Sequence, residues 1–195
     1  LGFGIFPAMV VGVLVGIVCG LISGIMVAHF EVPALIATLA MQTIARGFAF
    51  IMTQGIPVYG LPESIKTLGQ GYFLGIPIPV YILALVFFIG WWMLEQTSFG
   101  RHLYAIGGNE EVARLSGINV LVKKIQIYSL SGFFAGLSGV IMLSRLNSGQ
   151  PATSEGFEMD VITAAVLGGV SVAGGQGKII NVVAGVLIMG MLSNG

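Results

Sequence analysis

Polar side chains recur at every fourth position in one otherwise apolar stretch, at Thr38, Gln42 and Arg46. In a helix this spacing places the three side chains on one face. Hydroxyl, amide and guanidinium groups on one face can hydrogen bond a polar solute, so the stripe is a candidate wall of a solute path. The alternative is that Arg46 lies near the helix end and extends its guanidinium into water. The sequence leaves both interpretations open.

Residues 109–117 carry the signals of a short, capped helix. Asn109 can serve as the N-cap, and Glu110 and Glu111 place negative charge in the first turn. Arg114 lies in the last turn, and Gly117 follows as the glycine that ends the helix. Val112 and Leu115 add a small apolar face. A helix of this length is unstable alone in water, so we expect a docking surface to hold it. A simple capped turn is the alternative.

One short motif suggests catalysis: residues 136–139 spell Gly-Leu-Ser-Gly, which matches the Gly-x-Ser-Gly of intramembrane serine proteases. A nucleophilic serine needs a base within hydrogen-bond reach, and the topology derived below places His29 and His102 far from Ser138. Small-Ser-small triplets are common where membrane helices pack. We therefore expect no catalytic residue in this chain.

Nucleotide and metal sites are not expected either. The stretch GGQGKI at 174–179 has the Gly-Lys pair of a P-loop, but Val172 stands where that motif needs Gly and Ile179 where it needs Ser or Thr. Cys19 is the single cysteine, so neither a disulfide framework nor a thiolate metal cluster is available. We expect this chain to bind no cofactor, and any ATP hydrolysis to come from a partner.

The composition defines the surroundings of these residues. Of 195 residues, 56% are hydrophobic, 8% are charged and 30 are Gly, whereas a soluble domain carries about 25% charge and about 7% Gly. Such a chain cannot cover a water-facing surface, which points to a polytopic protein of the lipid bilayer. Eight Lys+Arg balance eight Asp+Glu. Nucleic acid, which needs a basic excess to neutralise its phosphates, is therefore excluded as a partner.

About 20 apolar residues are needed to cross the roughly 30 Å hydrocarbon core. The runs without charge predict four spans, at 5–28, 34–52, 77–95 and 125–146. Two Gly-rich runs, 161–177 and 179–195, are shorter, and we expect tilted spans, half-helices or a re-entrant pair there. The predicted fold is an all-α, polytopic transmembrane bundle with short or re-entrant Gly-rich segments near the C-terminus. It forms a single transmembrane domain over 1–195.

Basic residues are unevenly distributed, and cytoplasmic loops hold an excess of them. The segment 97–124 contains four of the eight: Arg101, Arg114, Lys123 and Lys124. We therefore place 97–124 in the cytoplasm, as a loop within the membrane domain. Counting spans from this loop puts 53–76 and 147–160 outside and the turn at 174–178 inside. Pro and Gly recur through 53–79 and predict turns with no continuous helix, in a connector or a contact for an external partner.

Small residues form stripes on two of the expected helices. The stripe on the first helix comprises Gly12, Gly16, Gly20 and Gly24, and the one on the fourth comprises Gly132, Ala135, Gly136 and Gly139. Gly inside a helix costs up to about 1 kcal/mol relative to Ala, so each stripe needs a compensating contact. Close approach of helices through small residues supplies one in lipid. Static packing is favoured over a moving interface.

Three stretches resemble the ribose-type sugar permeases of ABC importers. They are AIGGNEEVARLSGINV at 105–120, the stretch from Arg145 to Ile179, and VPALIATLAMQTIARG at 32–47. Such permeases dock on their ATPase through a Glu-Ala-Ala-x-x-x-Gly loop. In the stretch 105–120, Glu111, Val112, Ala113 and Gly117 resemble this loop. Val112 departs from the Ala that directly follows Glu in that loop, a small change on a face that we expect to be buried.

The resemblance implies a multi-pass permease of the bacterial inner membrane that imports a monosaccharide, ribose or a related pentose or hexose. It implies three partners: an ABC ATPase subunit inside that uses the ATP, an extracytoplasmic sugar-binding protein, and a second permease copy or paralogue. With the capping pattern, it assigns ATPase docking to Asn109, Glu110, Glu111, Ala113, Arg114 and Gly117. Relative to that family the sequence lacks both ends, so we expect an excerpt that does not transport alone.

A channel, or an ion- or proton-coupled carrier for small polar solutes, is the alternative from a different class. Proton relays place carboxylates or histidines at mid-membrane depth. Glu95 and His29 instead fall at the ends of the expected spans. Dependence of uptake on ATP hydrolysis discriminates an importer from such a carrier.

Overall fold

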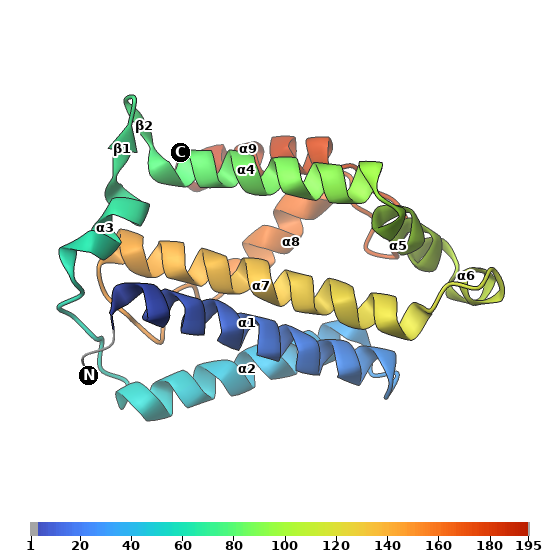
Figure 1. Ribbon diagram of the computed structural model, residues 1–195, viewed down its shortest axis with the longest axis horizontal. Coiled ribbons are helices and arrows are strands. Elements are labelled where there is room, and N and C mark those ends of the chain that lie inside the picture. The colour runs from blue at the N-terminus through green and yellow to red at the C-terminus, as the bar shows by residue number, and fades with distance from the viewer. Residues whose placement is uncertain (1–3, 195) are drawn as a thin grey trace. The chain divides into compact units, whose positions relative to one another are not determined.

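The computed structural model describes residues 4–194 (Figure 1), so Leu1 and Gly195, the ends of the predicted domain, lie outside the described residues. The all-helical class is confirmed. In chain order the elements are α1 (Ile5–Ala28), α2 (Ala34–Thr53), α3 (Glu63–Gln70), β1 (Tyr72–Phe73), β2 (Ile76–Pro77), α4 (Ile78–Trp91), the π-helical turn η1 (Trp92–Gln96), α5 (Ser98–Gly108), α6 (Glu110–Leu115), α7 (Val120–Leu146), α8 (Phe157–Leu167) and α9 (Ile179–Asn194).

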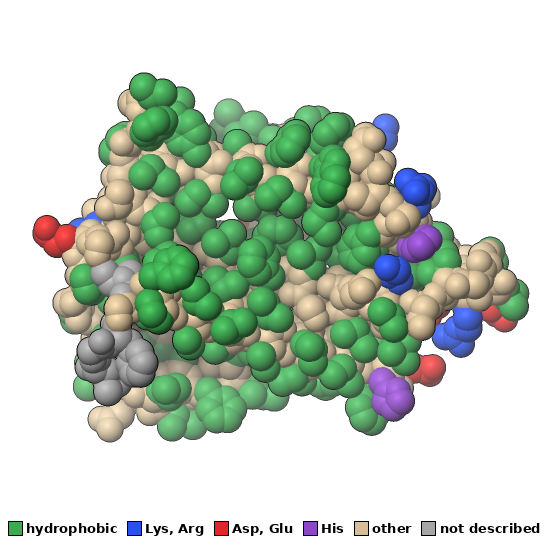
Figure 2. All heavy atoms as spheres, in the orientation of Figure 1, with side chains coloured by type: hydrophobic (Ala, Val, Ile, Leu, Met, Phe, Trp, Pro, Cys, Tyr) green, Lys and Arg blue, Asp and Glu red, His purple; other side chains and the backbone are tan. Residues whose placement is uncertain are grey.

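Four helices in the described part of the chain are long and apolar enough to cross a membrane. They are Phe6–Ala28, Ala34–Thr53, Ile78–Gln96 and Val120–Leu146. Figure 2 shows hydrophobic side chains along the middle of the helices, while acidic, basic and histidine side chains gather near helix ends. The polytopic membrane fold is thereby confirmed, and these four helices coincide with the four predicted spans.

Helix α7 begins at Val120 and contains Lys123 and Lys124. The prediction that this helix starts at 125 is wrong because it treats a charge as the end of a span. Asn119 caps the helix instead, since its Oδ1 accepts the Val122 N–H at 3.2 Å. The Lys123 ammonium lies 5.2 Å from the centroid of the Phe99 ring, so this charge is accommodated near the start of the helix and does not interrupt it.

The described chain forms two compact units, each assembled from separate stretches. The first comprises the chain up to Ile82 together with Lys124–Thr153, and it contains α1, α2, α3, the hairpin and most of α7. The second comprises Leu83–Lys123 and the chain from Ser154 onward, with α5, α6, α8 and α9. The chain passes from one unit to the other at three points. Two of these points lie inside α4 and α7, so no linker composition marks them in the sequence.

In the first unit, α1 and α7 meet through the glycines of their stripes. A Cβ built on Gly16 would lie 2.9 Å from the Cα of Gly136, and one on Gly20 would lie 3.0 Å from the Cα of Gly132. Both distances are shorter than ordinary contacts between carbon atoms. The two backbones therefore touch directly, and neither helix has room for a side chain there.

The ends of the stripes show the direction of the two helices. Gly24 lies against Ile125, near the start of α7, and Gly12 lies against Val140, near its end. The helices are therefore antiparallel. Gly139 belongs to the sequence stripe of α7, yet a Cβ there would meet no described neighbouring atom within 4 Å.

In the second unit, α8 and α9 also approach through glycine. A Cβ on Gly168 would lie 2.7 Å from the Cα of Val182, and Gly185 lies against the backbone of α8. Helix α8 has 11 residues, which corresponds to about 16 Å, about half of the hydrocarbon core. The predicted run 161–177 is therefore helical only to Leu167, and its re-entry into the membrane stays a prediction.

The segment 53–79 contains helix α3, and the prediction of turns alone is wrong there. Pro62 precedes α3 and Gly71 follows it, so these helix breakers flank the helix. Gly69 lies inside it, against the backbone of Arg145. That glycine serves a close contact with α7, and composition alone cannot distinguish this role from a turn.

A small antiparallel hairpin of β1 and β2 follows α3. Its turn residues Leu74 and Gly75 have φ of 50° and 78°, the left-handed conformation that two-residue hairpin turns favour. The Tyr81 hydroxyl in α4 donates to the Phe73 carbonyl at 3.1 Å. The hairpin is thereby attached to the first turn of the span that follows it.

Gly132→Ala is expected to destabilise the protein, because the added methyl would lie 3.0 Å from the Cα of Gly20 and push α1 away from α7. Over-packing of this kind costs typically about 1–3 kcal/mol. Gly139→Ala is the matched control on the same helix, since its methyl meets no described neighbour and Ala favours a helix. Unfolding in a mixed-detergent titration compares the two variants, and equal midpoints would contradict the contact.

Candidate functional site

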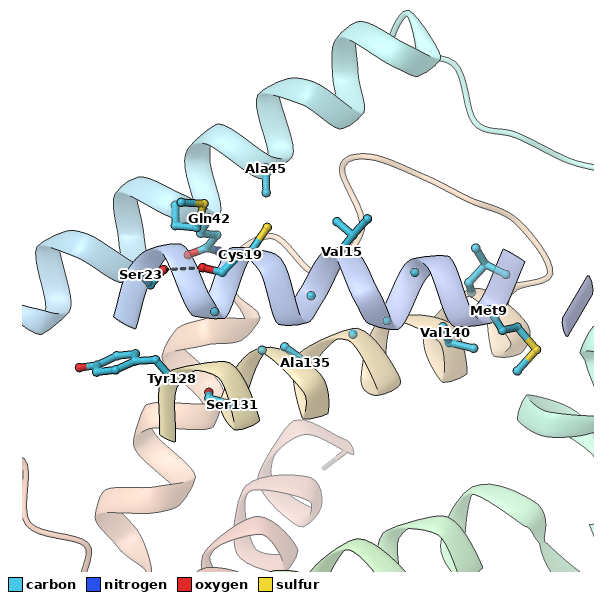
Figure 3. Close-up of a pocket in the computed structure, with 18 of the residues that line it drawn as sticks. Met9, Val15, Cys19, Ser23, Gln42, Ala45, Tyr128, Ser131, Ala135 and Val140 are labelled. Carbon is cyan, nitrogen blue, oxygen red and sulfur yellow. Dashed lines mark hydrogen bonds between the residues drawn. The ribbon is translucent and has the colours of Figure 1, made fainter. Parts of the chain in front are cut away.

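Helices α1, α2 and α7 surround a cavity of about 620 Å³ in the first unit (Figure 3). Ligand pockets in proteins typically measure about 300–1,000 Å³. Much of the wall is glycine, alanine and other apolar residues. Six side chains add polar atoms: Cys19 and Ser23 on α1, Thr38 and Gln42 on α2, and Tyr128 and Ser131 on α7.

Two of the three residues of the predicted polar stripe line this cavity. Thr38 and Gln42 lie one turn apart on α2, and Figure 3 shows Gln42 directed toward α1. The Thr38 hydroxyl donates to the Ala34 carbonyl at 3.0 Å, which leaves its lone pairs free to accept. Arg46 is not among the described residues that line the cavity, and its place on a solute path stays a prediction.

Sequence reasoning missed Ser23, Tyr128 and Ser131 as cavity residues. Ser23 is 5% exposed, and its hydroxyl donates to the Cys19 carbonyl at 2.9 Å. Tyr128 and Ser131 lie just before Gly132 on α7. A signal was present, because the glycine stripe identifies the face of α7 that meets α1, and polar residues beside that face are candidates.

The polar atoms gather at one end of the cavity. They belong to the second half of α1 and to the first halves of α2 and α7. These stretches share one end because α1 is antiparallel to α7 and a short loop joins it to α2. The other end is lined by Met9, Val140 and Leu143. In the predicted orientation, the polar end is the cytoplasmic half.

The cavity wall carries no formal charge in the part of the chain that the structure describes. None of the described lining residues is Asp, Glu, Lys, Arg or His. Hydroxyl and amide groups both donate and accept hydrogen bonds, as the hydroxyls of a neutral solute do. The wall is therefore suited to a neutral, hydroxyl-rich molecule, and it offers no charge to hold an ion.

The geometry does not support a serine nucleophile at Ser138. Val140 lies against Gly12, so Ser138 is near that level of the bundle. His29 follows the end of α1, and the helix between Gly12 and His29 spans about 25 Å. His29 is therefore out of hydrogen-bond reach. Among the described residues, no group of three or more His, Cys, Asp or Glu side chains could hold a metal.

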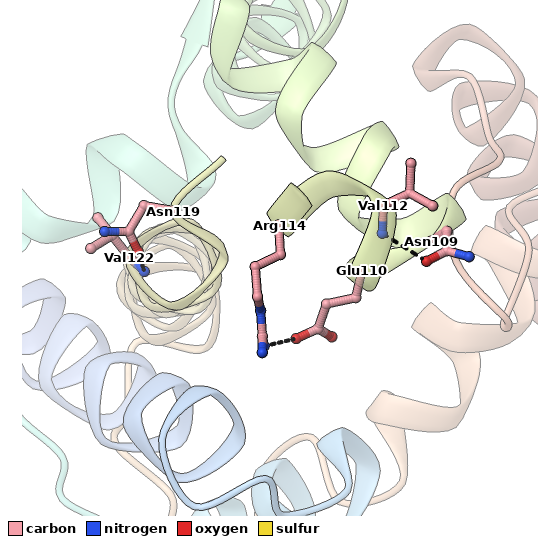
Figure 4. A network of polar contacts seen from close by, with 6 residues as sticks. All are labelled: Asn109, Glu110, Val112, Arg114, Asn119 and Val122. Atoms are coloured by element: carbon pink, nitrogen blue, oxygen red, sulfur yellow. Dashed lines mark hydrogen bonds and ion pairs between the residues drawn. The ribbon is translucent and has the colours of Figure 1, made fainter. Parts of the chain in front are cut away.

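Helix α6 is the predicted docking helix, and Figure 4 shows its polar contacts. The Asn109 Oδ1 accepts the Val112 N–H at 3.1 Å, and Arg114 donates to Glu110 at 3.4 Å. Gly117 has φ of 82°, the left-handed conformation of a residue that ends a helix. The local sequence therefore specifies both ends of this helix.

Helix α6 turns one small side chain inward and two apolar side chains outward. Ala113 is 2% exposed, whereas Val112 is 57% and Leu115 is 84% exposed. The expectation that Val112 lies on a buried face is therefore wrong within this chain, because Ala113 occupies the buried position. Glu111 is exposed as well. Apolar and acidic side chains are thus both accessible to another protein.

A glycine loop after α8 contacts α5 in the second unit. Gly107 of α5 lies against the backbone of Gly175, and the Tyr104 hydroxyl donates to the Gly177 carbonyl at 2.8 Å. Such a close backbone approach needs glycine on both sides. The turn at 174–178 and the loop 97–124, both predicted to be cytoplasmic, are therefore in contact. Such contact is compatible with both segments lying on the same side of a membrane.

The two predicted outer segments also lie together, in the first unit. Val58 and Gly149 exchange two backbone hydrogen bonds, at 2.8 and 2.9 Å. Gln70 donates to the Arg145 carbonyl at 2.9 Å. These contacts join segments that are far apart in the chain, and no local sequence signal predicts them.

Known proteins similar to this chain are membrane permeases. The family model described as "Branched-chain amino acid transport system / permease component" matches residues 1–195. The ribose import permease protein RbsC of Bacillus subtilis is 47% identical over 190 residues, which cover 96% of this chain and 59% of that protein. The L-arabinose transport system permease protein AraH of Escherichia coli is 46% identical over 172 residues, 88% of this chain and 52% of that protein.

A third relative, the L-arabinose ABC transporter permease protein AraH of Azospirillum brasilense, is 43% identical over 183 residues, 94% of this chain and 54% of that protein. The chain thus spans 52% to 59% of the length of these three relatives. No solved structure matches it significantly. Because the family model matches along the whole sequence, the chain belongs to the permease family that this model describes.

Proposed function

We propose that this chain forms the membrane part of an ATP-driven importer of a monosaccharide. The observation that carries the proposal is the 47% identity to a ribose import permease along 96% of the chain. The two other relatives are named for L-arabinose. Ribose and arabinose are both pentoses, so the proposed solute is ribose or a related pentose, with hexoses next.

The cavity in the first unit is the proposed part of the solute path. Its polar end offers the amide of Gln42 and the hydroxyls of Thr38 and Ser131, which match the hydroxyl groups of a sugar in both donors and acceptors. The described wall has no charged side chain, which suits a neutral molecule better than an ion or a proton. The same feature makes an ion-coupled carrier the weaker hypothesis.

An ATPase subunit is the partner proposed for α6. Six residues are too few for a stable helix in water, and α6 exposes Val112 and Leu115. A protein surface that covers these two side chains would both stabilise the helix and move with it. Of the residues predicted for docking, Ala113 is buried against its own unit, so its proposed role is to seat the helix. ATP hydrolysis is assigned to the partner.

Helix α7 is the proposed connection between this docking site and the cavity. It begins at Val120, shortly after α6 ends at Leu115, and the same helix carries Tyr128 and Ser131. The Asn119 cap fixes its first turn. A displacement of α6 is therefore passed along a continuous helix to the polar end of the cavity.

The remaining proposed partners are an extracytoplasmic sugar-binding protein, a second permease copy or paralogue, and the bilayer of the bacterial inner membrane. The names of the relatives support this setting, since they describe import and an ABC transporter. The proposed surface for the binding protein comprises α3 and the loops that follow α2 and α7, and the Val58–Gly149 pair joins these two loops.

Leu115→Glu is expected to lower co-purification of the ATPase subunit by about tenfold or more, a difference of about 1.4 kcal/mol, because it places a charge in the covered apolar contact. Leu74→Glu is the matched control, since Leu74 is also 84% exposed but lies in the hairpin on the predicted outer side. Affinity purification from membranes, with the permease normalised by immunoblot, measures the effect. Equal loss in both variants would refute docking at α6.

Gln42→Leu is expected to lower sugar uptake by the complete importer about threefold to tenfold, because one hydrogen bond contributes about 0.5–1.5 kcal/mol. Thr43→Val is the control, since Thr43 is the next residue of α2, and its hydroxyl donates to the Leu39 carbonyl of its own helix. Uptake of radiolabelled ribose and arabinose into cells measures both. Normal uptake by Gln42→Leu would remove α2 from the path.

Arg46→Leu separates the two interpretations of the third stripe residue. Impaired uptake at normal expression places Arg46 on the path, and unchanged uptake places its guanidinium at the interface.

The same uptake assay in vesicles tests the energy source: uptake is expected to stop when ATP is replaced by a non-hydrolysable analogue. Uptake that persists would overturn the importer.

A further inference from the structure

A second cavity, of about 330 Å³, lies at the predicted outer end of the first unit. It is lined by Ala49, Thr53, Val58, Leu61, Leu143, Gly149, Gln150 and Pro151. Leu61 and Leu143 also line the larger cavity. These two leucines therefore belong to the wall of each cavity.

The two cavities are polar away from these two leucines and apolar beside them. The outer cavity has Thr53 and Gln150 in its wall, and the polar side chains of the larger cavity lie at its far end. Next to the two leucines, the larger cavity is lined by Ile65 and Val140. The described residues that the two cavities share are therefore apolar, and the hydrogen-bonding side chains of each wall lie away from them.

Leu61 is held in place by contacts on both sides of it in the chain. Residues 58–65, which we name the strap, are attached at one end by the backbone pair of Val58 with Gly149. At the other end, the Ser144 hydroxyl donates to the Ile65 carbonyl, and Ser144 is fully buried. Both attachment points lie on α7 or directly after it. The strap therefore fixes Leu61 beside Leu143 of the same helix.

We propose that Leu61 and Leu143 form an apolar partition, which is the permeability barrier between an outer vestibule and the sugar cavity. Apolar constrictions in membrane pathways exclude water and ions because the constriction dewets. The partition deepens the proposed function, because it assigns the residues that keep the path closed at its outer end. It stands on the two shared leucines and the attached strap, and it does not depend on which sugar is carried.

The chain contains its own reporter for this barrier. Cys19 is the single cysteine in the sequence, and it lines the larger cavity but not the outer one. A positively charged, membrane-impermeant methanethiosulfonate added to the outer face of spheroplasts must cross the partition to modify this thiol. A small, permeant methanethiosulfonate reaches the thiol without crossing it and serves as the measure of thiol reactivity.

The test compares the rate of Cys19 modification in the complete importer, assayed by the mass shift of the peptide that contains Cys19. The wild type is expected to react slowly with the charged reagent, and Leu61→Ala/Leu143→Ala at least about tenfold faster. Val140→Ala removes bulk from the larger cavity alone and is expected to keep the wild-type rate, as is the volume-conserving Leu143→Met. Rates with the permeant reagent are expected to be equal in all four proteins.

Two results would overturn the partition. The first is fast modification of the wild type by the charged reagent, and the second is an unchanged rate in the double variant. If the double variant does not reach the membrane, Leu61→Ala alone replaces it, since Leu61 lies outside the helices. Sugar uptake is measured in parallel: absent uptake by the wild type with a slow Cys19 rate refutes the importer but leaves the partition standing.

Discussion

The first unit depends on the direct contact between the backbones of α1 and α7. In lipid, burying one apolar side chain against another gains little, so association relies on close packing. Gly16 and Gly20 against Gly132 and Gly136 provide that packing without side chains. The side chains that flank the stripe are displaced to its edges. Those on the edge toward α2, such as Ser23, form the wall of the cavity.

Helix α7 takes part in most of the functional features described above. Its first turn follows the proposed docking helix, its first half carries Tyr128 and Ser131, and its last turns hold the strap through Ser144. A helix of 27 residues is longer than the about 20 needed for a span. Within the first unit, the same helix therefore lines the cavity and holds the strap.

Features that depend on local sequence were predictable here. The spans follow from charge-free runs, the caps of α6 follow from Asn109 and Gly117, and the glycine stripe identifies the face between α1 and α7. The prediction fails where a residue type has two uses. Lys123 and Lys124 lie inside a helix, where the Lys123 ammonium lies over the Phe99 ring. Gly69 lies inside α3 because it touches α7.

The cavity and the strap could be predicted only in part. Thr38 and Gln42 were found because they share one helix face, whereas Ser23 and Tyr128 join them only through the packing of three helices. The Val58–Gly149 pair joins residues separated by 91 positions in the chain. Backbone pairing over such a distance carries no local pattern, because any residue except proline can form it.

The uncharged wall of the cavity has a consequence for energetics. Moving one elementary charge across a membrane potential involves about 2.3 kcal/mol per 100 mV. If the proposed solute is a neutral sugar, it moves no charge through the field as it passes the described wall, which has no charged side chain. The membrane voltage would then neither drive nor oppose the proposed solute step. Under that proposal, the rate of this step would be the same in a polarised cell and in a depolarised vesicle.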